Sequence, residues 1–220
     1  MMKKLLSKLL TFILIAAIIF TCGITALGYF KYKTVISEVP LFEKVAIVKD
    51  NPHYTQLKEI NPDFTDSIVA TEDHRFYKHG AIDGISLVRA TIVNLLKGEI
   101  KQGGSTITQQ VAKNLYFSND QHFIRKVAEM FAAYDLEKNY TKDEILELYV
   151  NIVYYGDNNY GIQQASKNYF GTTPDKLSFD QATLLAGLPQ APSSYALSQH
   201  PERAKERQKE VIEALEKYRK

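Results

Sequence analysis

Residues 61–73 read NPDFTDSIVATED, and this stretch predicts a helix that places a carboxylate among apolar side chains. The Asn-Pro pair at its start is typical of a helix beginning, because proline fits the first helical position. Phe64, Ile68 and Glu72 recur at intervals of four residues, which puts them on one helix face. A carboxylate on an apolar face is either paired with a cation or has a raised pKa that suits proton transfer.

The rest of the chain carries further signals of short, capped helices. Asp83 and Gly98 bracket one apolar, periodic stretch as an N-cap and a closing glycine. Capping boxes of the form Ser/Thr-x-x-Glu/Gln occur at residues 141–144 and 178–181, and Pro201 opens a charged terminal helix. These signals predict a mostly α domain with short connections.

An uncharged apolar run precedes this domain, at residues 9–30. As a helix its 22 residues span about 33 Å, which is enough to cross the hydrocarbon core of a bilayer. We expect a single transmembrane anchor between a cytoplasmic tail, residues 1–8, and a juxtamembrane segment, residues 31–62, whose run 45–48 (VAIV) has β-type composition. The domain then covers residues 63–220.

Charge and cysteine content limit the partners of the chain. Three lysines precede the apolar run and two directly follow it, a slight bias that favours a cytoplasmic N-terminus and an external domain. The formal net charge is only +2, so no overall field attracts nucleic acid. Cys22 is the single cysteine, which excludes an internal disulfide, and the bulky residues before it disfavour lipidation. An anionic partner must be held by a local group of cations.

A second charged residue lies within an apolar pattern. Arg89 falls in the stripe formed by Ile85, Ile92 and Leu96 on its predicted helix. A buried, unpaired guanidinium is costly, so Arg89 needs a carboxylate or a phosphate as its partner. From spacing alone, a structural ion pair between Glu72 and Arg89 explains these residues as well as a functional site does.

Residues 103–114 read GGSTITQQVAKN and are dense in hydrogen-bond donors. Two glycines open the backbone, a hydroxyl residue can cap the helix that follows, and a helix N-terminus with a lysine suits phosphate oxygens. The alternatives are a capped, solvated helix or a helix-turn-helix element, and the membrane anchor counts against the latter. The candidate contacts to phosphate or sugar are Ser105, Thr106, Gln109, Lys113 and Asn114.

Glu129 shares a helix face with two cations, since it follows Arg125 by four residues and Lys126 by three. The ordinary interpretation of such a group is a surface ion-pair set that stabilises the fold little. The alternative is a second active carboxylate flanked by cations.

The order of these segments resembles the peptidoglycan glycosyltransferase family, the glycosyltransferase module of class A penicillin-binding proteins. Four signatures of that family match in order, and a fifth matches loosely. They are residues 70–80 (ATEDHRFYKHG), 103–114, 125–129 (RKVAE), 142–151 (KDEILELYVN) and, for the looser match, 207–212 (RQKEVI). The resemblance extends over about residues 64–215, nearly all of the part outside the anchor.

This resemblance implies a mostly α, lysozyme-like, two-lobed glycosyltransferase domain behind a single transmembrane helix, on the outer side of a bacterial cytoplasmic membrane. It implies that lipid II units are joined into β-1,4-linked glycan with inversion, and that undecaprenyl pyrophosphate leaves. The implied partners are lipid II, the growing lipid-linked glycan, membrane lipid and cell-wall synthesis proteins, with no nucleic acid.

The resemblance also implies roles for single residues. Glu72 becomes the general base for the acceptor's 4-hydroxyl. Glu129 assists the departing pyrophosphate directly or through a divalent metal, magnesium or manganese, and no organic cofactor is expected. The expected substrate-binding residues are Arg89, Ser105, Thr106, Gln109, Lys113, Asn114, Arg125 and Lys126.

The sequence departs from the family pattern at two places. Gln121 stands where members often carry arginine, and Gln208 follows Arg207 where a second basic residue is common. Neither Ser-x-x-Lys nor Lys-Thr-Gly occurs, so we expect the monofunctional form without a transpeptidase.

Two other functions remain to be weighed. A lysozyme-like hydrolase would cut glycan, but it would not need the donors and cations suited to phosphate. A non-catalytic membrane-anchored scaffold would not need both Glu72 and Glu129.

Overall fold

The computed structural model describes residues 2–98, 103–117 and 123–220, and helices make up almost all of its regular structure. The α-helices are α1 (Met2–Glu38), α2 (Leu41–Lys49), α3 (Pro62–Glu72), α4 (Gly84–Lys97), α5 (Ile107–Tyr116), α6 (Phe123–Asn139), α7 (Lys142–Ile152), α8 (Ile162–Phe170), α9 (Phe179–Gly187), α10 (Pro192–Tyr195) and α11 (Pro201–Tyr218). Short 3-10 helices lie at Leu57–Glu59, Phe76–Lys78 and Pro174–Lys176. Within the described ranges β-pairing is limited to an isolated bridge between Tyr154 and Tyr160. The predicted mostly α class is confirmed.

Most helix boundaries lie where the sequence predicts them. Asn61 caps α3 by accepting the N–H of Asp63, and Asp83 caps α4 by accepting the N–H of the residue two positions on. Both predicted capping boxes form, at residues 141–144 and 178–181. These bonds join residues two or three positions apart, so local sequence is enough to predict them.

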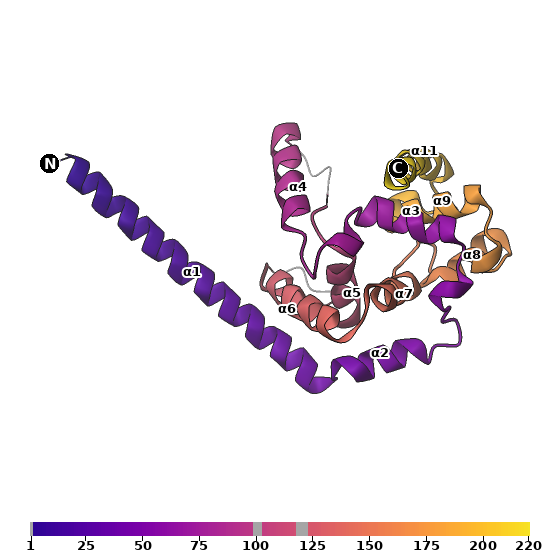
Figure 1. The fold of residues 1–220 in the computed structure, drawn as a ribbon, viewed down its shortest axis with the longest axis horizontal. Helices are drawn as coiled ribbons and strands as arrows, with labels where there is room; N and C mark the ends of the chain where they lie inside the picture. The colour runs from indigo at the N-terminus through magenta and orange to yellow at the C-terminus, as the bar shows by residue number, and fades with distance from the viewer. Residues whose placement is uncertain (1, 99–102, 118–122) are drawn as a thin grey trace.

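The helices form two groups around a shared core. In one group α3 packs on α9 and α11, and in the other α5 packs on α6 and α7 (Figure 1). Phe64 and Ile68 of α3 are fully buried, as are Tyr149 of α7 and Tyr155 just after it. The buried face of α3 therefore points inward and leaves its last residue, Glu72, at the edge of the core.

The run 45–48 corrects one expectation, because it lies in helix α2 and not in extended chain. Leu41 and Val45, four residues apart, are both buried, and α2 packs against α7. Packing against a neighbouring helix outweighs the weak preference of valine and isoleucine for strands.

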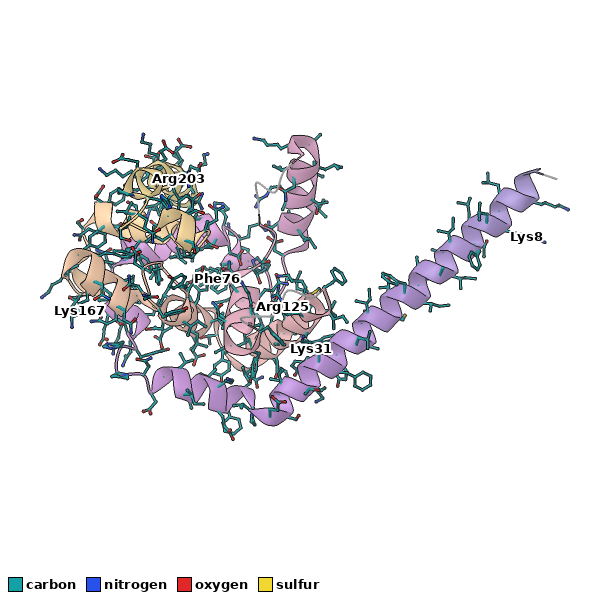
Figure 2. The ribbon with its side chains drawn as sticks, turned by 180° about the vertical axis from the view of Figure 1, so that it is seen from behind. Lys8, Lys31, Phe76, Arg125, Lys167 and Arg203 are labelled. Carbon is teal, nitrogen blue, oxygen red and sulfur yellow. The ribbon has the colours of Figure 1, made fainter. Side chains whose placement is uncertain are left out.

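Helix α1 is long and apolar enough to cross a membrane over Leu6–Glu38, and the protein is membrane-anchored. Figure 2 shows Lys8 far from the body and Lys31 near the point where α1 meets it. The end of α1 packs on α6, where the Tyr32 hydroxyl donates to Asp135 Oδ2 at 3.0 Å. A side chain at Gly28 would collide with Val127, so this contact is close. The anchor is thus a continuous helix that extends past residue 30 and docks on the domain.

Helix α4 stands away from the body (Figure 1), and Ala90 is its one buried residue. Its apolar side chains face solvent, with Leu95 and Leu96 exposed to 81% and 80%. Arg89 is exposed as well, which corrects the expectation that it is buried in an apolar stripe. The predicted apolar periodicity of α4 is present, but periodicity does not show whether another element covers the apolar face.

Candidate active site

A polar cleft of about 510 Å³ lies between the end of α3, the start of α4, residues 103–106 and helix α11. Elements far apart in sequence form its walls. Glu72 and Asp73 come from the end of α3, Arg89 from α4, and Arg207 from α11. A concave polar site with several ionisable groups suits a charged or sugar-like ligand.

Glu72 lies at the cleft wall with its carboxylate partly desolvated. The side-chain amide of Gln110 donates to Glu72 Oε2 at 2.9 Å. Desolvation raises the pKa of Glu72 above its ordinary range, although the Gln110 hydrogen bond and the charge of Arg207 lower it. The charge of Asp73 raises the pKa further. The predicted combination of an apolar helix face and a raised pKa is present, whereas the role of Glu72 as a base stays a prediction.

Asp73 follows directly but uses its carboxylate differently. Its Oδ1 lies 2.7 Å from His79 Nε2, and its Oδ2 accepts the backbone N–H of Ile107 at 3.0 Å. Ile107 is the first residue of α5, so Asp73 attaches the end of α3 to the start of α5. The sequence does not indicate a role for Asp73. Its position, about 100° around the helix from Glu72, indicates only that its side chain points away from the face that carries Glu72.

Asp73, His79 and Asp83 each offer one ligand atom, and these atoms lie within 4.8 Å of one another. Both oxygens of Asp73 already face donors, and Asp83 Oδ2 accepts from Arg75 Nε at 3.0 Å and from Ser86 Oγ at 2.6 Å. A guanidinium at hydrogen-bond distance opposes a second cation. We interpret this cluster as a hydrogen-bond network that holds the loop between α3 and α4.

The segment that enters α5 is held by its own side chains. Thr106 donates to the carbonyl of Ala81 at 2.7 Å and accepts the N–H of Gln109 at 3.1 Å. The Gln109 amide oxygen accepts the N–H of Thr106 at 2.9 Å, which completes a capping box. Gln109 is buried and caps α5, and it is not among the described residues that line the cleft. Its substrate contact stays a prediction that this arrangement does not support.

Glu129 is completely buried, at 0% exposure, and forms ion pairs with two cations. Arg125 Nη1 donates to Oε1, and Lys126 Nζ lies 3.1 Å from Oε2. Lys126 also donates to Ser105 Oγ at 2.8 Å, and Ser105 lines the cleft. The interpretation as a surface ion-pair set is therefore wrong, because the Glu129 carboxylate is buried and its partner Lys126 is connected to the cleft wall.

The same cluster bears on the expected divalent metal. Both Glu129 oxygens already face cations, so a metal ion at Glu129 would meet two like charges. The described donor set therefore does not fit such an ion. The pKa of Lys126 is lowered to about 8, mainly by burial and to a smaller extent by the charges of Arg125 and Lys113. Lys113 therefore lies close enough to act on this cluster.

The remaining candidates differ in their surroundings. Arg89 Nη2 donates to Ser86 Oγ at 3.3 Å, and within the described ranges no ion pair joins Arg89 to Glu72. The alternative of a structural Glu72–Arg89 pair is therefore excluded. Lys113 is exposed and Asn114 half-buried on α5. Gln121 lies outside the described residues.

Arg207 and Gln110 contribute to the site although sequence analysis did not assign them to it. The Arg207 side chain is only 10% exposed, its Nη1 pairs with Glu210 Oε2 at 2.6 Å, and its buried Nε has no hydrogen-bond partner. Arg207 is the first residue of the loosely matching fifth signature, and this match is the sequence feature that could have identified it as a site residue. Gln110 lies inside the second signature, but nothing local indicates that its amide reaches Glu72.

The sequence matches one protein family and is similar to several named bacterial proteins. A family described as transglycosylase matches residues 40–216. A protein of Cupriavidus necator named as a transglycosylase is 38% identical over 214 residues, which cover 97% of this chain and 90% of that protein. Penicillin-binding protein 1A of Aquifex aeolicus is 43% identical over 162 residues, 74% of this chain and 22% of the relative. Penicillin-binding protein 1F of Bacillus subtilis is 39% identical over 170 residues, 77% of this chain and 24% of the relative. The chain thus spans less than a quarter of these two penicillin-binding proteins.

Proposed function

This chain belongs to the transglycosylase family, and from that premise we propose that it polymerises lipid II into β-1,4-linked glycan and releases undecaprenyl pyrophosphate. It is a membrane-anchored peptidoglycan glycosyltransferase, and its domain has the lysozyme-like, two-lobed fold of the family. The growing lipid-linked glycan acts as donor and the 4-hydroxyl of lipid II as acceptor, with inversion at the anomeric carbon.

The observation that carries the proposal is a desolvated carboxylate on the cleft wall together with a cation cluster that contacts another part of the wall through Ser105. Glu72 lines the cleft at the end of α3, and Lys126 reaches Ser105 at the entry to α5. An inverting displacement needs a base on one side of the anomeric carbon and charge stabilisation on the other. A base with a raised pKa is better matched to neutral pH than an ordinary carboxylate.

In the proposed step Glu72 accepts the proton of the acceptor hydroxyl. The hydroxyl oxygen forms a bond to the donor's anomeric carbon while the bond from that carbon to the pyrophosphate oxygen breaks with its electron pair. Lys126 and Arg125 stabilise the charge that develops on the leaving pyrophosphate, with Lys113 at the exposed side of the cluster. Buried Glu129 keeps these two half-buried cations in place through its ion pairs.

The exposed apolar faces support a lipid-linked substrate. The first part of α1 and the projecting α4 both present large apolar side chains to the surroundings. Exposed apolar surfaces of this kind are typical of contact with lipid. A soluble hydrolase of free glycan would not need them, nor would it need cations suited to a pyrophosphate.

Incubation of the detergent-solubilised protein with labelled lipid II tests the proposal. We expect a polymer that a β-1,4-muramidase digests, and no polymer from the Glu72→Gln variant. Release of soluble sugar fragments from preformed glycan, without polymer formation, would favour the lysozyme-like alternative. Lack of both activities would favour the scaffold.

The external position of the domain is tested separately, in spheroplasts. Protease added to intact spheroplasts should cut the domain while a cytoplasmic marker protein survives. Protection of the domain until the cells are lysed would show that the proposed orientation is wrong.

A further inference from the structure

We propose that Gln110, supported by Tyr149, is a positioning residue that holds Oε2 of Glu72 and thereby reserves Oε1 for the acceptor's proton. This inference rests on the proposed function, since it concerns the oxygen that acts as the base. It assigns a task to a residue that contacts Glu72 but is not among the described residues that line the cleft.

The contact to Glu72 comes from one side only. Gln110 Nε2 donates to Glu72 Oε2 at 2.9 Å, a normal hydrogen-bond length. Among the described residues no other side chain donates to this carboxylate, and Glu72 lines the cleft. One oxygen is therefore held by the protein, while the other remains for a ligand in the cleft.

Tyr149 supports the required orientation of the Gln110 amide. Its hydroxyl lies 3.4 Å from Gln110 Oε1, a long bond, and its side chain is fully buried. An ionised carboxylate only accepts hydrogen bonds, so Gln110 must present its NH₂ group to Glu72. Burial raises the pKa of Tyr149 well above its ordinary value, so the hydroxyl keeps its proton and favours the amide oxygen on its own side.

The helix that carries Gln110 is fixed by the neighbour of Glu72. Asp73 accepts the N–H of Ile107 at 3.0 Å, and Gln110 lies three residues further along α5. Glu72 and Asp73, consecutive residues at the end of α3, thus both contact α5. Asp73 accepts a backbone N–H of that helix, and Glu72 accepts the side-chain amide of Gln110. This arrangement restricts the position of Gln110 more than a single hydrogen bond would.

Several groups from different elements act on Glu72, so the effect of Gln110 must be separated from theirs. Arg207 of α11 lowers the Glu72 pKa, and Asp73 raises it. Tyr149 and Tyr155 face the carboxylate as neutral phenols, whose own pKa values Glu72 raises. Removal of the Gln110 donor leaves all four groups in place, so the Glu72 pKa should rise. Since Glu72 is active when ionised, the acid limb of the activity profile should move to higher pH.

The test compares Gln110→Leu and Tyr149→Phe with the wild type, and uses Gln164→Leu as a matched control. Gln164 lies on α8, where its amide oxygen accepts the N–H of Tyr160 at 3.3 Å, and it does not line the described cleft. We expect Gln110→Leu to lower kcat/KM at neutral pH about 5- to 30-fold and to move the acid limb upward. Tyr149→Phe should show a smaller shift in the same direction, and Gln164→Leu none.

An NMR titration of isotope-labelled glutamate side chains provides a readout that does not need activity. The resonance that disappears in Glu72→Gln identifies Glu72, and in Gln110→Leu it should titrate at higher pH. An unchanged titration and an unchanged acid limb would overturn the proposal, even if Gln110→Leu lowers the melting temperature. If Gln110→Leu does not fold, Tyr149→Phe decides by the same two measurements. If the wild type forms no polymer, the proposed function fails, while the titration still tests the contact.

Discussion

The backbone N–H of Ile107 donates a 3.0 Å hydrogen bond to Oδ2 of Asp73. This bond connects the end of α3, which lines the cleft, to the first turn of α5, which directly follows the cleft-lining residues 103–106. Because the same carboxylate also faces His79, one side chain holds three parts of the chain together. The distance between Glu72 and the Ser105–Lys126 contact therefore depends on Asp73.

Asp73→Ala should destabilise the fold, because it leaves the buried N–H of Ile107 without its acceptor and removes the partner of His79 Nε2. We expect the free energy of unfolding to fall by about 2–4 kcal/mol. Asp66→Ala on the same helix is the control, since Asp66 pairs with Arg219 at the surface and should cost about 0–1 kcal/mol. Thermal or denaturant unfolding measures both variants. Equal stabilities of the two variants would contradict the anchoring role.

Glu72→Gln should abolish polymerisation without unfolding the protein. The amide keeps the shape of the side chain but cannot accept a proton, and loss of a general base costs about 100- to 10,000-fold in rate. The melting temperature should stay near that of the wild type, because burial penalises the charge that the substitution removes. Melting and polymerisation are measured on the same preparation. A large drop in melting temperature with activity surviving below it would leave Glu72 a structural residue.

Lys126 should produce a basic limb in the pH dependence of kcat/KM. Its pKa is lowered from 10.5 to about 8, so the free enzyme loses this charge as the pH rises through about 8. Lys126→Arg keeps the charge at higher pH and should remove the limb. Unfolding does not explain this limb. Burial of charged Lys126 destabilises the folded state below about pH 8, and this destabilisation is lost as the pH rises from about 8 to 10.5. The fold therefore becomes more stable over the range in which activity falls. Identical basic limbs in the wild type and Lys126→Arg would exclude Lys126 as their origin.

Lys113→Ala should weaken catalysis and leave the fold intact, because Lys113 is exposed. Loss of a charge-assisted bond to phosphate costs about 1.5–3 kcal/mol, or roughly 10- to 100-fold in rate. Lys138→Ala is the matched control, since Lys138 is exposed in the last turn of α6. Polymerisation rates and melting curves are compared for both variants. A rate like that of the control would remove Lys113 from the site.

Sequence by itself determined the features that depend on neighbours along the chain. The capping box at residues 141–144 closes through atoms of residues three positions apart, so its residue types predict it. The membrane anchor follows from the length and composition of one helix. The placement of Glu72 follows from the spacing of Phe64 and Ile68, since helix geometry puts residues four apart on one face. The family resemblance likewise rests on short segments read in order.

Tertiary structure alone decided what each exposed or buried group faces. Run 45–48 is helical because α7 covers one face of α2, and Arg89 is exposed because no described element covers α4. Gln110 reaches Glu72 across 38 positions of sequence, and Lys126 reaches Ser105 across 21. Such contacts depend on how whole helices are placed against each other. That placement is set by packing of the entire core, so the sequence around the contacting residues does not predict the contact.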